Sequence, residues 1–260
     1  MIAAFGVGYI YVRDDDTPME VLELLIIIVL AGILSIFAQY LDLLTFDGAV
    51  ASLAIGLVIG LFGSVDWLLI LIIFTALGFT ATLVGLAKKR SRGLQEGKTG
   101  ERMYKNVVAV GITPCIFAVL FFIMGEEHYT IMSIAYISSI TVAAADTIAS
   151  EVGVRDQRVW LITNFKRVEP GVDGGVSVTG TFVAIVASFV TTVIGWLLIF
   201  GFTFEWFFFI PVIAGMVGCF ADSILGATLE SKGRISKYTN NAVTAFLGSL
   251  FAIFVYMVFF

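Results

Sequence analysis

Two short sequences in this chain each place an aspartate at the end of a long apolar segment. They are residues 145–148 (ADTI) and 221–224 (ADSI), and a glutamate follows each one, Glu151 or Glu230. A charged side chain in the middle of a membrane costs roughly 2.5–3.5 kcal/mol on insertion scales. Carrying that cost twice in the same local sequence indicates a functional site, and the repetition itself indicates an internal repeat.

The composition is that of an integral membrane protein. Of the 260 residues, 59% are hydrophobic and 13% are charged, and the mean hydropathy is +1.02, which excludes an ordinary soluble domain. We predict an all-α polytopic membrane protein, a single domain over residues 1–260 with about eight transmembrane helices; whether residues 1–12 also span is left open. The candidate spans, each long enough to cross a bilayer, are 21–41, 48–64, 67–87, 107–124, 130–149, 176–200, 206–227 and 239–260.

Basic residues are concentrated in three polar segments. Of the 15 lysines and arginines, seven lie in 88–105, four in 151–175 and three in 228–238. Alternation of the spans puts these segments on one face, and the positive-inside rule makes them cytoplasmic loops. Because no transit peptide precedes the first span, we expect the plasma membrane of a prokaryote. Both repeated sequences then place their acids at the cytoplasmic face.

Several helices that leave this face are expected to begin alike. Asp and Asn are preferred N-caps, and plain capping is an open alternative for Asn106 and Asn241. For Asp173, the following Gly174 and Gly175 favour a backbone that approaches a ligand closely at a helix N-terminus, where a phosphate could bind. The four candidate starts are Asp47, Asn106, Asp173 and Asn241.

The pattern describes an internal repeat of helical hairpins, one copy over 106–146 and another over 173–222. Each copy begins on the same face, so the repeats are parallel, and repeats in membrane proteins often place a site at their interface. In the second copy Ala214, Gly218, Asp222 and Gly226 form one stripe of a helix. The stripe would bury Asp222 against a neighbouring backbone, so that acid needs a metal, a basic residue or a proton as its partner.

The predicted cytoplasmic site combines carboxylates with lysines and arginines. Carboxylates without a His/Cys cluster suit Mg²⁺ better than zinc, and basic side chains suit nucleotide or lipid phosphates. A metal, a cationic clamp and an oriented acceptor are the parts that phosphoryl transfer needs. Lys166 and Arg167, between Asn164 and the Asp173 turn, are plausible members of such a site.

Four stretches, 144–153, 161–166, 170–177 and 221–227, resemble one family of integral membrane proteins, and the resemblance covers most of the chain from about Asp47 onward. That family includes plant phytyl-phosphate kinase and transmembrane protein 19, and is distantly similar to phytol kinase, dolichol kinase and phosphatidate cytidylyltransferase. The resemblance implies a CTP-dependent kinase that uses Mg²⁺ to convert a prenyl monophosphate, of phytyl or geranylgeranyl type, to the diphosphate at the cytoplasmic face.

The resemblance also implies roles for individual residues. Four carboxylates would be catalytic: Asp146, Asp222, Asp173 and Glu151. Three of these, Asp146, Asp222 and Glu151, would bind Mg²⁺, while Lys166 and Arg167 would clamp phosphate charge. The other substrate- or nucleotide-binding candidates are Asn164, Gly174, Gly175, Ser177, Asp47, Asn106, Ser150, Ser223 and Asn241. The expected partners are a prenyl monophosphate lipid, CTP and the lipid bilayer, with no nucleic acid.

Two other functions stay open. A cytidylyltransferase that forms a CDP-lipid would use the same acids but transfer CMP. A membrane transporter would also explain glycine-rich helices with intramembrane acids, but it would need those acids near mid-membrane with a route to both faces. Asp146 and Asp222 lie near the ends of their apolar segments, which favours an enzyme.

Overall fold

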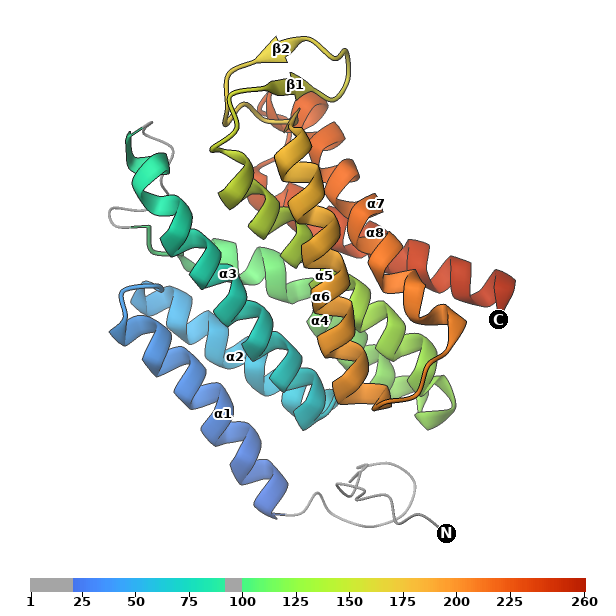
Figure 1. The fold of residues 1–260 in the computed structure, drawn as a ribbon. Helices are drawn as coiled ribbons and strands as arrows, with labels where there is room; N and C mark the ends of the chain where they lie inside the picture. The colour runs from blue at the N-terminus through green and yellow to red at the C-terminus, as the bar shows by residue number, and fades with distance from the viewer. Residues whose placement is uncertain (1–20, 92–99) are drawn as a thin grey trace.

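The computed structural model describes residues 21–91 and 100–260, and the described chain is almost wholly helical (Figure 1). The question of whether residues 1–12 span the membrane lies outside the described residues. The helices are α1 (Val21–Tyr40), α2 (Phe46–Phe62), α3 (Val65–Ser91), α4 (Tyr104–Met124), η1 (Glu126–His128), α5 (Tyr129–Gly153), α6 (Val178–Phe200), η2 (Trp206–Phe208), α7 (Phe209–Leu225), η3 (Gly226–Glu230) and α8 (Lys237–Phe259). Three short strands, β1 (Val159–Leu161), β2 (Arg167–Val168) and β3 (Gly175–Val176), form an antiparallel sheet between α5 and α6.

The all-α membrane architecture predicted from hydropathy is confirmed. Within the described ranges, seven helices are long and apolar enough to cross a membrane. The remaining long helix, α2, has 17 residues and is apolar but shorter. At 1.5 Å per residue it is about 25 Å long, slightly less than the roughly 30 Å hydrocarbon core of a bilayer.

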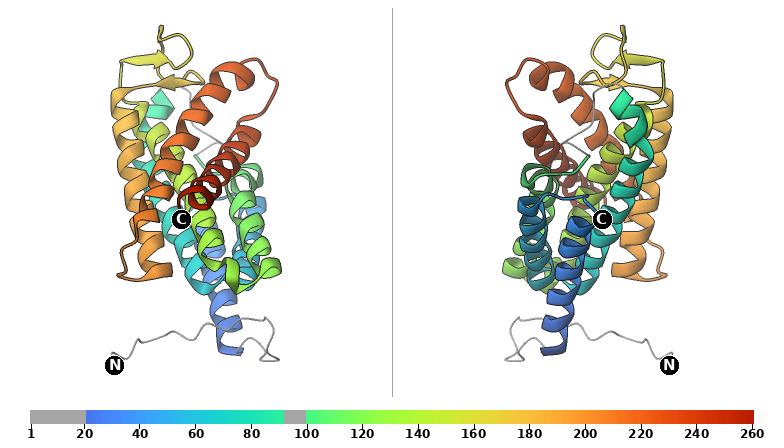
Figure 2. Two further views of the ribbon diagram at one scale, coloured as in Figure 1. Left: turned by 90° about the vertical axis from the view of Figure 1, so that its right-hand side faces the viewer. Right: turned by 90° about the vertical axis from the view of Figure 1, so that its left-hand side faces the viewer.

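Successive helices run in opposite directions along the bundle. Figures 1 and 2 show the strands and the α7–α8 connection at one end, while the α4–α5 and α6–α7 connections lie at the other. The hairpins α4–α5 and α6–α7 therefore start from the same end, as a parallel repeat requires. Which side of the membrane this end faces stays a prediction.

Helix α5 is the centre of the bundle and fixes the position of Asp146. It contacts α3, α4, α6, α7 and α8, and every residue from 132 to 145 is buried. Two of its buried hydroxyls are satisfied by its own turns, since Ser138 and Ser139 donate to the carbonyls of Ile134 and Tyr136, both at 2.7 Å. Satisfying polar groups inside the helix is what a membrane interior demands.

The predicted small-residue stripe on α7 packs against its neighbours. Ala214 is fully buried, and a Cβ built on Gly218 would lie only 2.4 Å from Val142 Cγ2 of α5. A Cβ on Gly226 would lie 3.0 Å from the Gly174 backbone nitrogen. The first approach brings α7 against α5, and the second brings η3 against the 171–175 turn. Asp222 and Asp146 line one cavity.

None of the four candidate starts, Asp47, Asn106, Asp173 and Asn241, is the N-cap residue of its helix. Helices α4 and α8 begin at Tyr104 and Lys237, before Asn106 and Asn241, because residues earlier in the chain already cap them. Asn106 still takes part, since its Oδ1 accepts the Met103 backbone N–H at 3.2 Å. The observed N-cap residues of α2, α4, α6 and α8 are Thr45, Met103, Ser177 and Ser236.

The Gly218–Val142 contact yields a stability prediction. Replacing Gly218 with Ala should lower the free energy of unfolding by about 1–3 kcal/mol, because the new methyl group overlaps Val142. Adding Val142→Ala should recover part of that loss. The measurement is the thermal unfolding midpoint in detergent, with Gly32→Ala as control, since a Cβ at Gly32 meets nothing within 4 Å. Equal midpoints for the Gly218 and Gly32 variants would contradict the packing described.

Candidate functional site

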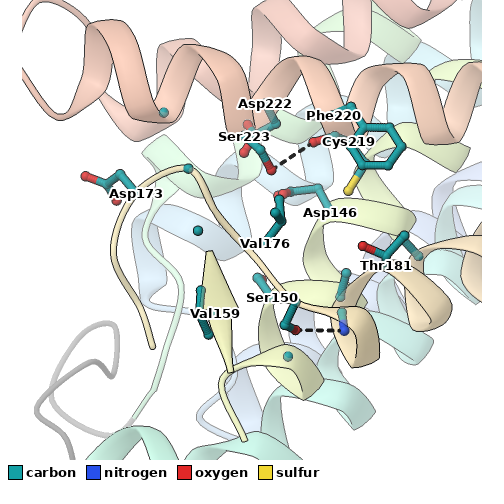
Figure 3. A pocket seen from close by; sticks show the side chains of 18 of the residues that line it. Asp146, Ser150, Val159, Asp173, Val176, Thr181, Cys219, Phe220, Asp222 and Ser223 are labelled. Atoms are coloured by element: carbon teal, nitrogen blue, oxygen red, sulfur yellow. Dashed lines mark hydrogen bonds between the residues drawn. The ribbon is translucent and has the colours of Figure 1, made fainter. Parts of the chain in front are cut away.

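A cavity of about 260 Å³ lies at the end of the bundle that carries the strands (Figure 3). Side chains and backbone from α5, α6, α7, η3 and the start of α8 line it, together with the turn at 171–175 and strands β1 and β3. The site thus combines the two helices that end in the repeated sequences with the connections that follow them.

Two carboxylates from different helices meet in this cavity. Asp146 comes from α5 and Asp222 from α7; both are half-buried, and Figure 3 shows them next to each other. The Asp222 carboxyl group interacts with that of Asp146, and the charges of Glu230 and Lys237 also act on it. Asp222 Oδ1 is buried and has no hydrogen-bond partner among the described residues. Neighbouring carboxylates in a partly buried site favour a shared cation or proton.

The turn at 171–175 forms one wall, and its shape requires glycine. Gly174 has a φ of +76°, and a Cβ there would lie 2.4 Å from Ala227 Cβ and 2.5 Å from the Ser223 carbonyl oxygen. The turn therefore packs its backbone directly against the end of α7. Asp173 is exposed, and in Figure 3 its carboxylate points away from Asp146 and Asp222.

Three serines that line the cavity also shape the local backbone. Ser177 caps α6 by accepting the Gly180 N–H at 3.0 Å. Ser150 and Ser223 donate to carbonyls of their own helices, those of Thr147 at 3.0 Å and Cys219 at 3.3 Å. Nine of the residues predicted from the sequence line this cavity: Asp146, Ser150, Asp173, Gly174, Gly175, Ser177, Asp222, Ser223 and Asn241.

Glu151 lies elsewhere, on a different face of α5. It is buried, and its Oε1 accepts the Thr82 hydroxyl of α3 at 3.1 Å, while the same hydroxyl accepts Arg102 Nη2 at 3.1 Å. This chain of contacts links α5 to α3 and to the segment before α4. Glu151 is therefore not among the residues that line the cavity, and its predicted role as a metal ligand stays a prediction.

Asp47 and Asn106 are placed at the starts of α2 and α4. Asp47 accepts the Thr45 hydroxyl at 2.5 Å and the Tyr104 N–H at 3.4 Å. Asn106 lines a second, smaller cavity of about 50 Å³ between α2, α3 and α4. Both residues hold helix starts together and lie outside the main cavity.

The predicted phosphate clamps lie on the far side of the small sheet. The strand order is β2-β1-β3, and both β3 and Val159 of β1 line the cavity, so Arg167 of β2 lies beyond β1, at the outer edge of the sheet. Arg167 Nη2 donates to the Gln157 carbonyl at 3.5 Å. Asn164 Oδ1 accepts the Lys166 N–H at 3.0 Å and closes the turn between β1 and β2. Both basic side chains are exposed, and their clamping role stays a prediction.

Three residues of the site were missing from the predicted set. Glu230 and Lys237 line the cavity, and Asn240, which is 1% exposed, holds the wall behind them. Asn240 Nδ2 donates to the Asp222 carbonyl and to Glu230 Oε2, both at 3.1 Å. Glu230 ends η3, a π-helical turn of the kind often found at functional sites. The sequence did carry a signal for Glu230, because a glutamate follows each of the two repeated sequences.

The donor set fits Mg²⁺ bound jointly with a phosphate. Within residues 21–91 and 100–260, no cluster of three or more His, Cys, Asp and Glu side chains suitable for a metal is found. Mg²⁺, however, is usually held by one or two carboxylates while waters and substrate phosphates complete its shell. Asp146 and Asp222 supply two carboxylates, and the unpartnered Asp222 Oδ1 offers a ligand atom.

Comparison with known proteins places the chain among membrane proteins. The family described as Integral membrane protein DUF92 matches residues 29–255. The uncharacterized membrane protein MJ0933 of Methanocaldococcus jannaschii is 30% identical over 249 residues, which cover 94% of this chain and 98% of that protein. No solved structure matches.

Two similar proteins come from the plant Arabidopsis thaliana. The chloroplastic protein VTE6 is 28% identical over 198 residues, which are 74% of this chain and 59% of VTE6. Protein PGR is 32% identical over 187 residues, covering 63% of this chain and 64% of PGR.

The two adjacent asparagines give a second prediction. Asn240→Ala should lower the free energy of unfolding by about 1–3 kcal/mol, because the Glu230 carboxylate and the Asp222 carbonyl lose a buried donor. Asn241→Ala, at the half-buried neighbour that lines the cavity, should change it much less. Thermal unfolding midpoints of the two variants in the same detergent measure the difference. An equal loss in both would contradict the bracing role of Asn240.

Proposed function

We propose that this chain, which belongs to the family Integral membrane protein DUF92, is a CTP-dependent prenyl-phosphate kinase. The observation that carries the proposal is the pair of carboxylates, Asp146 and Asp222, brought together by α5 and α7 in a cavity at one end of a membrane bundle. The resemblance of residues 144–177 to a family that includes plant phytyl-phosphate kinase supports the same reaction.

Asp146 and Asp222 would hold Mg²⁺ together with the phosphates of CTP. The ion, when bound, neutralises phosphate charge and polarises the phosphoryl group for attack. Asp222 is also held in place by the Asn240 amide, which donates to its backbone carbonyl at 3.1 Å. The carboxylates are therefore positioned before any substrate binds.

A cation and a close backbone are available for the phosphates themselves. Lys237, the first residue of α8, lines the cavity, and its positive charge interacts with the Asp222 carboxyl group. The Gly174–Gly175 backbone also lines the cavity, without side chains that would keep a phosphate away. In this arrangement Lys237 takes the clamping role that the sequence had assigned to Lys166 and Arg167.

The chemistry needs no strong general base. A phosphate monoester has a second pKa of about 6, so the acceptor is mostly a dianion at pH 7 and is already a nucleophile. Its oxygen attacks the γ-phosphorus of CTP, the bond between that phosphorus and the β-γ bridging oxygen breaks, and CDP leaves. The sole histidine, His128, is in η1, on the connection at the opposite end of the bundle, which is consistent with a mechanism that does not use it.

The apolar surroundings of the cavity suit a lipid acceptor. Helices α6 and α7 expose large hydrophobic side chains on their outer faces, among them Phe182, Ile185 and Val217. A membrane-soluble prenyl monophosphate would present its phosphate at the polar end of the bundle and keep its chain in apolar surroundings. A cytidylyltransferase would share this geometry but transfer CMP, so the position of the transferred label decides between them.

The proposal is tested by following label from CTP into lipid. Purified protein in detergent with Mg²⁺ receives geranylgeranyl or phytyl monophosphate and either γ-labelled or α-labelled CTP. We expect lipid label from the γ position only. Asp146→Asn and Asp222→Asn should each lower kcat/KM at least roughly a hundredfold, because each variant removes a charge that holds the metal.

Asp66→Asn is the matched control, since Asp66 lies at the opposite end of the bundle, in the first turn of α3, and lines none of the cavity. It should keep the wild-type rate. Lipid label from the α position would replace the kinase with a cytidylyltransferase. No label with either nucleotide, from protein that unfolds cooperatively, would refute the enzyme proposal and turn attention to transport.

A further inference from the structure

The cavity has two ends of different chemical character. In Figure 3 Asp173 lies at one end, Phe220 and Cys219 lie at the other, and the two facing carboxylates lie between them. The end near Asp173 is formed by the glycine turn and exposed polar groups, whereas the end near Phe220 is formed by α6 and α7. A ligand with one charged and one apolar part would match this division.

The apolar end has a floor of small side chains. Ala145, Ala149 and Ala184 form a buried cluster where α5 meets α6, and Met216 and Cys219 of α7 pack against it. All of these except Ala145 line the cavity directly. Ala149 and Ala184 present only small side chains to the cavity that Asp146 and Asp222 also line.

The positions of these residues along α6 and α7 show how far the floor lies from the polar end of the cavity. Ala184 follows the α6 cap Ser177 by seven residues, which is about 10 Å along the helix. Met216 precedes Asp222 by six residues, which is about 9 Å along α7. On α6 and α7 the apolar floor thus extends about 10 Å from the polar rim towards the middle of the bundle, whereas on α5 Ala149 lies on the rim side of Asp146.

One side chain connects the cavity to the outer surface. Phe220 lines the cavity and is also 39% exposed, so it lies at the boundary between the cavity and the outside of the bundle. Its neighbours on that outer surface, Val217 and Ile224 of α7, are exposed and apolar. In a membrane this surface meets lipid, so an apolar chain that passes Phe220 would not cross water.

From this geometry, and resting on the proposed function, we infer that the hydrocarbon chain of the acceptor binds between α6 and α7. Its first isoprene units lie on the alanine floor, against Ala184 and Met216, and the rest of the chain leaves past Phe220 into the bilayer. The site therefore recognises the part of the prenyl chain nearest the phosphate and tolerates differences further along it.

A rival location exists in the described part of the chain. The cavity of about 50 Å³ between α2, α3 and α4 is lined by apolar side chains such as Ile55, Phe74 and Val110, and Arg102 is at its rim. It is smaller than the main cavity and has no carboxylate in its lining. Labelling distinguishes the two locations directly.

The first experiment uses a prenyl monophosphate with a photoreactive diazirine on its second isoprene unit. The probe is irradiated with the wild-type protein in lipid nanodiscs, and adducts are mapped by mass spectrometry with and without excess unlabelled geranylgeranyl monophosphate. We expect competed adducts in 181–185 and 216–220. Competed adducts in α2–α4 alone, or none that the competitor removes, would overturn the inference.

The second experiment places larger side chains in the apolar end of the cavity. Ala184→Leu should raise KM for geranylgeranyl monophosphate roughly tenfold, which is the scale on which hydrophobic pockets discriminate between substrates. The kcat/KM for the five-carbon dimethylallyl monophosphate should stay within about twofold of the wild-type value. Met216→Trp, at a half-buried position, fills the same depth from α7 and should act alike even if the buried Ala184 variant folds poorly. Val186→Leu, on the exposed face of α6, is the control and should leave both substrates unchanged.

The two proposals fail in different ways. Suppose that the wild type phosphorylates prenyl monophosphates, but that Met216→Trp and a folded Ala184→Leu leave the ratio of kcat/KM between the long and the short acceptor unchanged. The prenyl chain then binds elsewhere, and the kinase proposal stands. If the wild type phosphorylates no acceptor but competed adducts still map to α6 and α7, the lipid site stands and the kinase reaction fails.

Discussion

The structure depends on one unfavourable interaction, the approach of two carboxylates in a partly buried site. Asp146 and Asp222 come from different helices, and one oxygen of Asp222 is buried without a hydrogen-bond partner among the described residues. Like charges in such surroundings repel each other strongly unless a cation or a proton is shared. The fold must therefore supply enough packing energy elsewhere to keep the two helices together against this repulsion.

That packing comes from backbone contact, and it explains where the glycines lie. Gly218 lets α7 contact Val142 of α5 one turn below Asp222, and Gly174 lets the 171–175 turn contact the end of the same helix. Above this contact the π-helical turn η3 widens the path of the backbone, and Asn240 ties it to Asp222 and Glu230. A chain with larger residues at these positions would separate the two carboxylates and lose the cavity.

Hydropathy was sufficient to predict the helices, because each long apolar run has one stable form in a membrane. It could not predict which polar residues share a face. Glu151 follows Asp146 by five residues, which is about 140° around an α-helix, so it faces α3 and Thr82. Glu230 follows Asp222 across a π-helical turn and reaches the cavity, so the two repeated sequences are not equivalent. Strands of two residues carry too little pattern to show that β1 would separate Arg167 from the cavity.

The depth of the carboxylates favours an enzyme over a transporter. Asp146 lies 17 residues after the start of α5, about 25 Å along a helix of about 37 Å, so it is in the last third of the helix, towards the end that carries the strands. From that point to the other end, residues 132–145 of α5 are all buried in contact with five other helices. A transported solute would have to separate this packed core. In the proposed reaction, a lipid phosphate and a nucleotide would instead meet at the cavity from the bilayer and from the aqueous side, and the core would stay closed.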